Sequence, residues 1–315
     1  MSSGGDEPPA PVASKFETVS WYNRYSMNST IGPLVVGRTV LYGGTYAYQN
    51  TKASKLAALD ATTGMARWRM DYGAAFGPMV LQGGMIAVAA GDSVLGLDLG
   101  SGIQRWSVPI QPRLLTAAGD VVLVAERETI RAIDLASGTQ PWQATSTTDP
   151  VAAGDTALFM DGRTLRAVAA DDTLYFTTQS ASGTYVFHAF DPATQKDRWS
   201  RPLDSSSRVA PIVMGTLVAT ASNSSAETLV ALSRGTGTVA WSARADSVPV
   251  QPVLKGNVLY VAGQGPNRIY AFEAGTGAVL WSGRLWGWPM GMALTEDGML
   301  LVSADNLTLY AYQTR

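Results

Sequence analysis

The sequence predicts an all-β fold assembled from repeats of four antiparallel strands, and three observations carry this prediction. A motif that ends in tryptophan recurs six times: LAALDATTGMARW, VLGLDLGSGIQRW, IRAIDLASGTQPW, VFHAFDPATQKDRW, LVALSRGTGTVAW and IYAFEAGTGAVLW. The closing tryptophans follow one another at intervals of about 40 residues, with one longer interval. Each motif is preceded by a further pair of alternating segments around a turn, as in VLKGNVLYVAG at 253–263.

Each motif predicts a β-hairpin whose returning strand carries the tryptophan. A polar or acidic residue stands eight positions before the tryptophan, at Asp60, Asp98, Asp134, Asp191, Ser233 and Glu273. Its side chain can accept hydrogen bonds from turn amides. Glycine, which adopts positive φ without strain, stands four positions before the tryptophan in five copies, and Gln195 takes its place in the fourth.

Four strands in about 40 residues are typical of one blade of a β-propeller. The last unit, MLLVSADNLTLYAYQTR, has no closing tryptophan strand, whereas FETVSWYNRY carries the additional Trp21. Residues 17–24 are therefore predicted to supply the outer strand of the C-terminal blade, which closes the ring. The sequence thus predicts a flexible linker at 1–16 and a single seven-bladed propeller at 17–315.

Repeats of the form LYALD-x-x-TG-x-x-x-W resemble those of the PQQ-like β-propeller family, over residues 17–315. This resemblance implies a fold more than a function. Some members are dehydrogenases that bind pyrroloquinoline quinone and calcium, usually with eight blades, a cysteine pair and an acidic calcium site. Others, such as an outer-membrane-assembly lipoprotein and the sensor domains of bacterial Ser/Thr kinases, bind no cofactor. Because this chain has no cysteine and no matching acidic set, we expect a cofactor-free sensor or scaffold rather than a quinone-dependent dehydrogenase.

Composition excludes several other function classes. A net charge of −2 with 15% charged residues gives no footprint for nucleic acid or an acidic membrane surface. The single histidine, His188, excludes a multi-histidine metal centre, and its place within VFHAFD favours a strand residue over a catalytic one. The carboxylates recur once per motif, so a role in turns is favoured over acid–base catalysis. We expect no bound metal.

A ligand site is predicted at the funnel face, where the loops vary while the Asp/Gly turns of the other face do not. Aromatic rings beside arginines suit a planar ligand, a sugar or a peptide, although such rings can also pack between blades. The motif WGWPM lies outside the repeat pattern and is the best single candidate for contacts. The predicted ligand-binding residues are Trp286, Trp288, Tyr72, Phe76, Tyr22, Arg24, Tyr25, Arg113, Arg208 and Tyr46.

The interval between Trp142 and Trp199 is longer than the others by about 17 residues. Within it, ALFM-DG-RTLR predicts an added hairpin that turns at Asp161–Gly162. Such an insertion marks either a functional surface or an ordinary surface loop.

The sequence as a whole predicts a monomeric binding or scaffold module that recognises a small molecule or peptide at the funnel. The alternative is a cofactor-independent enzyme, such as a cyclase or isomerase of secondary metabolism, that uses the funnel as its pocket. The excess of arginine over lysine favours a bacterial source. The N-terminal linker favours an extracytoplasmic protein whose anchor or signal was removed, whereas a native Met1 would favour a cytoplasmic one.

Overall fold

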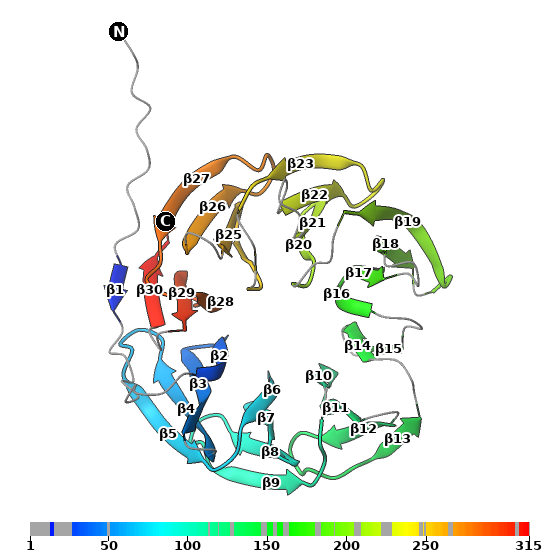
Figure 1. The fold of residues 1–315 in the computed structure, drawn as a ribbon. Coiled ribbons are helices and arrows are strands. Elements are labelled where there is room, and N and C mark those ends of the chain that lie inside the picture. Colours follow the sequence, from blue (N-terminus) through cyan, green and yellow to red (C-terminus); the bar gives the residue numbers. More distant parts are fainter. Residues whose placement is uncertain are drawn as a thin grey trace. The chain divides into compact units, whose positions relative to one another are not determined.

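The computed structural model contains strands and turns, with no helix among the residues it describes (Figure 1). The described residues are 13–15, 27–48, 51–112, 114–118, 120–126, 129–145, 150–153, 156–159, 164–179, 184–191, 193–204, 209–221, 229–245, 248, 250–263, 267–305 and 309–314. Contacts divide the chain into two compact parts, Phe16–Thr164 and Met1–Lys15 with Leu165–Arg315, called the N-terminal and C-terminal parts below.

The N-terminal part holds three four-stranded antiparallel sheets and one separate hairpin. The strands of the first sheet are β2 (Met27–Val36), β3 (Thr39–Tyr48), β4 (Thr51–Asp60) and β5 (Ala66–Tyr72). The second sheet has β6 (Phe76–Gln82), β7 (Met85–Ala90), β8 (Ser93–Asp98) and β9 (Gln104–Val108). The third has β10 (Leu114–Ala118), β11 (Val121–Glu126), β12 (Thr129–Asp134) and β13 (Trp142–Thr145), and the hairpin is β14 (Pro150–Ala153) with β15 (Thr156–Phe159).

The C-terminal part holds four further four-stranded sheets. The first two are β16 (Thr164–Ala170), β17 (Thr173–Gln179), β18 (Tyr185–Asp191), β19 (Lys196–Leu203), then β20 (Ile212–Met214), β21 (Leu217–Ala221), β22 (Leu229–Ser233), β23 (Val239–Ala243). The third is β24 (Val253–Lys255), β25 (Val258–Gly263), β26 (Arg268–Glu273), β27 (Val279–Arg284). The last joins β28 (Pro289–Leu294), β29 (Met299–Ala304) and β30 (Leu309–Gln313) to β1 (Ala13–Lys15).

These seven four-stranded sheets confirm the predicted all-β class and fit the seven predicted blades. Within each part, the first strand of one sheet lies beside the first strand of the next, as with β2 and β6, β6 and β10, β20 and β24, and β24 and β28. Successive sheets are therefore stacked through equivalent strands, as blades are.

The strand that completes the last sheet is not the one predicted. An N-terminal strand does pair with the C-terminal sheet, in the register Ala13↔Tyr312, Ser14↔Ala311 and Lys15↔Tyr310. The strand Ala13–Lys15 falls within the segment predicted as linker. Residues 17–24, which were predicted to form this strand, lie outside the described residues. The serine at 14 stands opposite Ala311, the position that a tryptophan takes in six other sheets, so no motif marks this strand in the sequence.

The insertion between the third and fourth tryptophans contains an added hairpin, but with different pairing from the prediction. Strand β15 pairs with the preceding β14, in a register from Pro150↔Phe159 to Ala153↔Thr156. Strand β16, on the far side of Asp161–Gly162, begins the next sheet instead. The predicted Asp-Gly hairpin is therefore wrong, because the strands flanking that dipeptide pair with different partners. The dipeptide itself lies outside the described residues.

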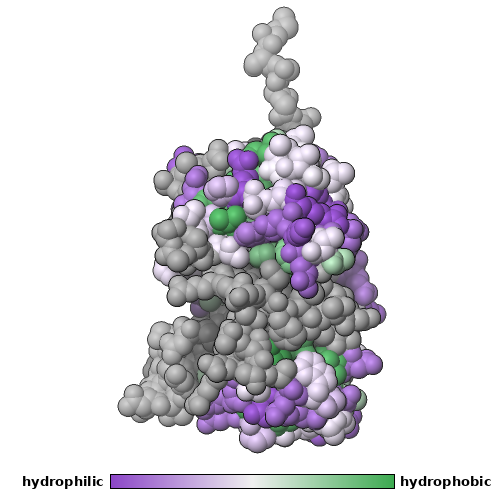
Figure 2. Space-filling view, turned by 90° about the vertical axis from the view of Figure 1, so that its right-hand side faces the viewer, coloured by the Kyte–Doolittle hydropathy of each residue, from purple (hydrophilic) through white to green (hydrophobic). Residues whose placement is uncertain are grey.

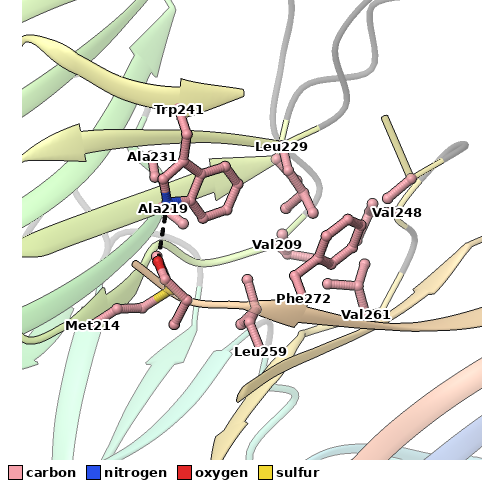
Figure 3. Close-up of a cluster of buried hydrophobic side chains, with 13 residues drawn as sticks. Val209, Met214, Ala219, Leu229, Ala231, Trp241, Val248, Leu259, Val261 and Phe272 are labelled. Atoms are coloured by element: carbon pink, nitrogen blue, oxygen red, sulfur yellow. Dashed lines mark hydrogen bonds between the residues drawn. The ribbon is translucent and has the colours of Figure 1, made fainter. Parts of the chain in front are cut away.

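The repeated tryptophan connects one sheet to the next. Within its own sheet it always stands opposite alanine or glycine, as in Ala58↔Trp68, Gly96↔Trp106 and Ala231↔Trp241. Figure 3 shows Trp241 in a core formed with Phe272 and other side chains of two neighbouring sheets. Its indole Nε1 donates to the carbonyl of Ala274 in the turn of the next sheet, at 3.0 Å. Trp241 thus fills the core between two sheets and satisfies a turn carbonyl, whereas the motif tryptophan Trp142 is 42% exposed.

The acidic position of the motif closes the turn, as predicted. Asp98 accepts hydrogen bonds from the amide and hydroxyl of Ser101 at 2.8 and 2.7 Å, and Arg105 pairs with its other oxygen at 3.2 Å. The Ser101 hydrogen bonds, followed by Arg105, lower the pKa of Asp98 to about 2. At Asp60 the Arg67 guanidinium, with turn amides, holds the pKa of the carboxyl well below its usual range. These carboxylates are bound by their own turns rather than presented to a ligand.

Candidate functional site

The WGW segment links β27 to β28 and is fixed through its backbone. The amide of Leu285 donates to the carbonyl of Asn267 at 2.6 Å, and the hydroxyl of Tyr310 donates to the carbonyl of Trp286 at 2.9 Å. Trp288 and Asp305 exchange two bonds, from the Trp288 amide to a carboxylate oxygen at 2.8 Å and from the Asp305 amide to the Trp288 carbonyl at 2.9 Å. Four hydrogen bonds from three neighbouring segments therefore define the course of this short connection.

The glycine between the two tryptophans allows this course. Gly287 has a φ of 107°, in a region that residues with a Cβ rarely adopt. The next residue but one, Pro289, is buried and begins β28 opposite Ala304. A bulge follows between Pro289 and Gly291, which sets Met290 outside the regular pairing.

The fixed backbone presents three large apolar side chains to solvent. Trp286 is 75% exposed, Trp288 is 55% exposed and Met290 is 37% exposed. Of the motif tryptophans, Trp106 and Trp241 are 8% and 7% exposed and Trp142 is 42% exposed, so Trp286 and Trp288 are more exposed than any of these three. The face seen in Figure 2 is mainly hydrophilic where residues are coloured, and its hydrophobic residues form small separate patches. Exposed aromatic and methionine side chains are enriched at interaction sites, so we name Trp286, Trp288 and Met290, which alternate along one short stretch of chain, the tryptophan surface.

Two arginines flank the tryptophan surface at the ends of the adjoining strands. Arg268, the first residue of β26, is paired in register with Arg284, the last residue of β27. Both side chains are exposed, and no described residue forms a hydrogen bond or ion pair with either guanidinium. The Leu285–Asn267 hydrogen bond joins the residues next to them in sequence. The sheet therefore places two positive charges without a described partner at the end of β27, directly before the WGW segment.

Of the other predicted ligand residues, Tyr46, Tyr72 and Phe76 belong to the N-terminal part, and the rest lie outside the described residues. In the N-terminal part, Tyr72 is half-buried and stacks on Phe76 with ring centroids 5.6 Å apart. Phe76 is 5% exposed and belongs to a core cluster, so its ring supports packing between sheets. Tyr46 lies in β3, and nothing is described of its side chain. The remaining predicted residues lie outside the described residues: Tyr22, Arg24, Tyr25, Arg113 and Arg208.

His188 is a strand residue of β18, as predicted, and both of its ring nitrogens are engaged. Its Nε2 lies 2.8 Å from the hydroxyl of Thr178, and its Nδ1 lies 2.9 Å from a carboxylate oxygen of Asp197. The ring also stacks on Phe176 with centroids 4.8 Å apart. These contacts join β17, β18 and β19, which gives the histidine a role in holding the sheet together.

Metal and membrane sites have no support in the described part of the chain. Its His, Asp and Glu side chains form no group of three or more that could hold a metal ion. No helix long and apolar enough to cross a membrane is found there either.

Two features of the site escaped sequence reasoning, namely the arginine pair and Met290. The pair could have been found from the motif itself. Because Trp281 stands opposite Ala271 at a fixed distance from the turn, counting outward along both strands brings Arg268 opposite Arg284. Met290 has no such signal, because its exposure depends on the bulge at the start of β28.

The comparisons with known proteins agree with this architecture. The family model described as outer membrane protein assembly factor BamB matches residues 17–243 and 243–315. The crystal structure of BamB from Moraxella catarrhalis is similar with a TM-score of 0.52 and 18% identity, covering 92% of this chain and 100% of that one. The crystal structure of the computationally designed Ika8 protein is similar with a TM-score of 0.54 and 11% identity, covering 95% and 98%. No curated protein sequence matches the chain.

Proposed function

Because the chain belongs to the family of the outer membrane protein assembly factor BamB, a family of β-propellers with PQQ-like repeats, we propose that it is a scaffold that binds a polypeptide partner. We assign the contact to the tryptophan surface. The observation that carries this assignment is the exposure of Trp286 and Trp288 on a backbone fixed by four hydrogen bonds. A rigid aromatic pair loses little conformational entropy on binding, which makes it an effective anchor for a protein partner.

A polypeptide suits this surface better than a small molecule. Sites for small ligands are concave and bury most of the ligand surface. Trp286 instead leaves three quarters of its surface to solvent, and Trp288 and Met290 are exposed as well. An extended partner can cover such exposed side chains, whereas a small ligand bound to them would remain largely hydrated. The two alternative functions are a module that binds a small molecule at the funnel and a cofactor-independent enzyme that uses the funnel as its pocket.

The cellular setting is part of the proposal. The matched family description concerns assembly of outer membrane proteins, which takes place outside the cytoplasmic membrane. We therefore place this chain outside that membrane, as an assembly scaffold or as the sensing part of a larger protein. The 18% identity to the Moraxella structure carries only the fold, so the partner need not be that of BamB.

Site-specific photo-crosslinking tests the proposed function. A benzoylphenylalanine probe would replace Trp286 or Trp288 in the native cell, and the control probe would replace Met65, which is 62% exposed in the turn of another sheet. The proposal expects one discrete polypeptide adduct from positions 286 and 288 and none from position 65. The small-molecule alternative would be established by two results together. Neither position 286 nor position 288 would give an adduct, and a small molecule would co-purify with the wild type but not with Trp288→Ala.

A further inference from the structure

The arginine pair beside the tryptophan surface is unusual for a β-sheet. Side chains directly opposite each other in an antiparallel pair have Cβ atoms about 5 Å apart, and like charges at such positions destabilise the sheet. Arg268 and Arg284 hold these positions without a described carboxylate to compensate them. Some strand arginines, such as Arg67 with Asp60 and Arg198 with Asp191, form ion pairs. Arg69 and Arg201, for which no described residue forms an ion pair, do not face another arginine across their sheets. The uncompensated pair is therefore suited to a negative charge supplied from outside.

We propose that the tryptophan surface together with Arg268 and Arg284 binds an acidic polypeptide segment that alternates carboxylates with apolar side chains. This inference rests on the proposed function and names the chemistry of the partner. The indoles of Trp286 and Trp288 cover its apolar side chains, while the two guanidinium groups pair with its Asp or Glu residues.

The charge distribution distinguishes this partner from other anions. Recognition of an anionic membrane requires a cluster of about four to eight basic residues, and nucleic acid requires several phosphate contacts. This surface supplies two arginines in a chain with a net charge of −2. Two positive charges next to two indoles match a short acidic and apolar segment, in which aromatic contact gives affinity and charge gives selectivity.

Peptide binding with charge reversal tests this inference. The probes are the peptides Gly-Asp-Phe-Asp-Leu-Asp-Gly, its Asn analogue and its Lys analogue, measured by calorimetry at low and at moderate salt. The wild-type protein is expected to prefer the Asp peptide over the Asn peptide by about tenfold, as two exposed ion pairs would give, and to lose this preference at higher salt. The double variant R268E/R284E is expected to prefer the Lys peptide.

Control variants distinguish the effect of the two arginine charges from a loss of folding and from a failure of the proposed function. Arg69→Glu changes an exposed arginine of β5 in the other part of the chain and should keep the Asp preference. Trp288→Ala should weaken binding of all three peptides. Equal binding of the Asp and Asn peptides would overturn the acidic inference while the polypeptide function stands. Failure of all three peptides would overturn both, and R268E/R284E-sensitive binding of phosphatidylglycerol vesicles without peptide binding would replace the polypeptide by a lipid.

Discussion

The indole of Trp241 donates a hydrogen bond to the carbonyl of Ala274 in the next sheet, and the turn glycine Gly277 lies against the same ring. A Cβ built on that glycine would come within 2.5 Å of an indole carbon. The same relation joins Trp68 to Leu99, Trp106 to Leu135 and Trp199 to Arg234. Tryptophan and glycine therefore recur together because one sheet supplies the ring and the next supplies the surface that receives it.

Trp241→Phe should reduce the free energy of unfolding by about 1–3 kcal/mol, because it leaves the Ala274 carbonyl without its donor and a gap in the core. Trp281→Phe is the matched control, since the Trp281 ring is half-buried against Tyr312 and its Nε1 donates to no described residue. Urea unfolding should show a smaller loss for the control. Equal losses would contradict the role of the hydrogen bond.

Gly102→Ala should destabilise the protein more than Gly83→Ala. Both glycines have positive φ, at 72° and 57°, so both variants incur a backbone cost of about 1–2 kcal/mol. Only at Gly102 would the new Cβ lie 2.7 Å from the ring of Trp68, whereas nothing lies within 4 Å at Gly83. Thermal unfolding of the two variants measures this difference. A loss at Gly83 as large as that at Gly102 would mean that backbone conformation alone explains the glycine that recurs in these turns.

Gln195→Gly should stabilise the protein by about 0.5–1 kcal/mol. Gln195 holds the turn position with a φ of 56°, where the other five motifs have glycine with φ from 69° to 72°. The gain from removing this strain exceeds the extra entropy that glycine brings to the unfolded chain. Chemical denaturation at constant pH tests the sign, and a loss of stability would show that the Gln195 side chain contributes contacts that outweigh its backbone strain.

Acid should destabilise the turns through their carboxylates. The folded pKa of Asp98 is about 2, below the unfolded value of about 3.9, so its charged form stabilises the fold above pH 4 and loses this effect as the pH falls toward 2. The Tm difference between wild type and Asp98→Asn should therefore shrink as the pH decreases from 5 to 2. Parallel Tm curves over this range would contradict the assignment.

The repeat could be predicted from the sequence because the interactions that require each motif residue are local and recur in each copy. The Asp98 turn, the positive φ at Gly102 and the small residue opposite Trp106 each leave a mark at a fixed spacing. The exposure of Trp286 and Trp288 could also be anticipated, because WGW departs from the repeat while Gly287 and Pro289 mark a turn.

Features that depend on pairing between distant segments could not be predicted. Ala13–Lys15 has no alternation and no tryptophan, and only the open edge of β30 makes it a strand. Likewise, the Asp161–Gly162 dipeptide is a strong local turn signal, but β15 pairs with β14 and β16 pairs with β17. In both cases the deciding contact lies outside the segment itself.

Fluorine NMR of protein labelled with 5-fluorotryptophan tests the central claim most directly, since the nine tryptophans report on architecture and surface together. Single Trp→Phe variants assign the resonances of Trp286 and Trp288. On addition of Gly-Asp-Phe-Asp-Leu-Asp-Gly, the account predicts that these two resonances shift saturably while those of Trp68, Trp106 and Trp241 stay in place. Saturable binding that shifts only the buried resonances, or that leaves Trp286 and Trp288 unchanged, would contradict it.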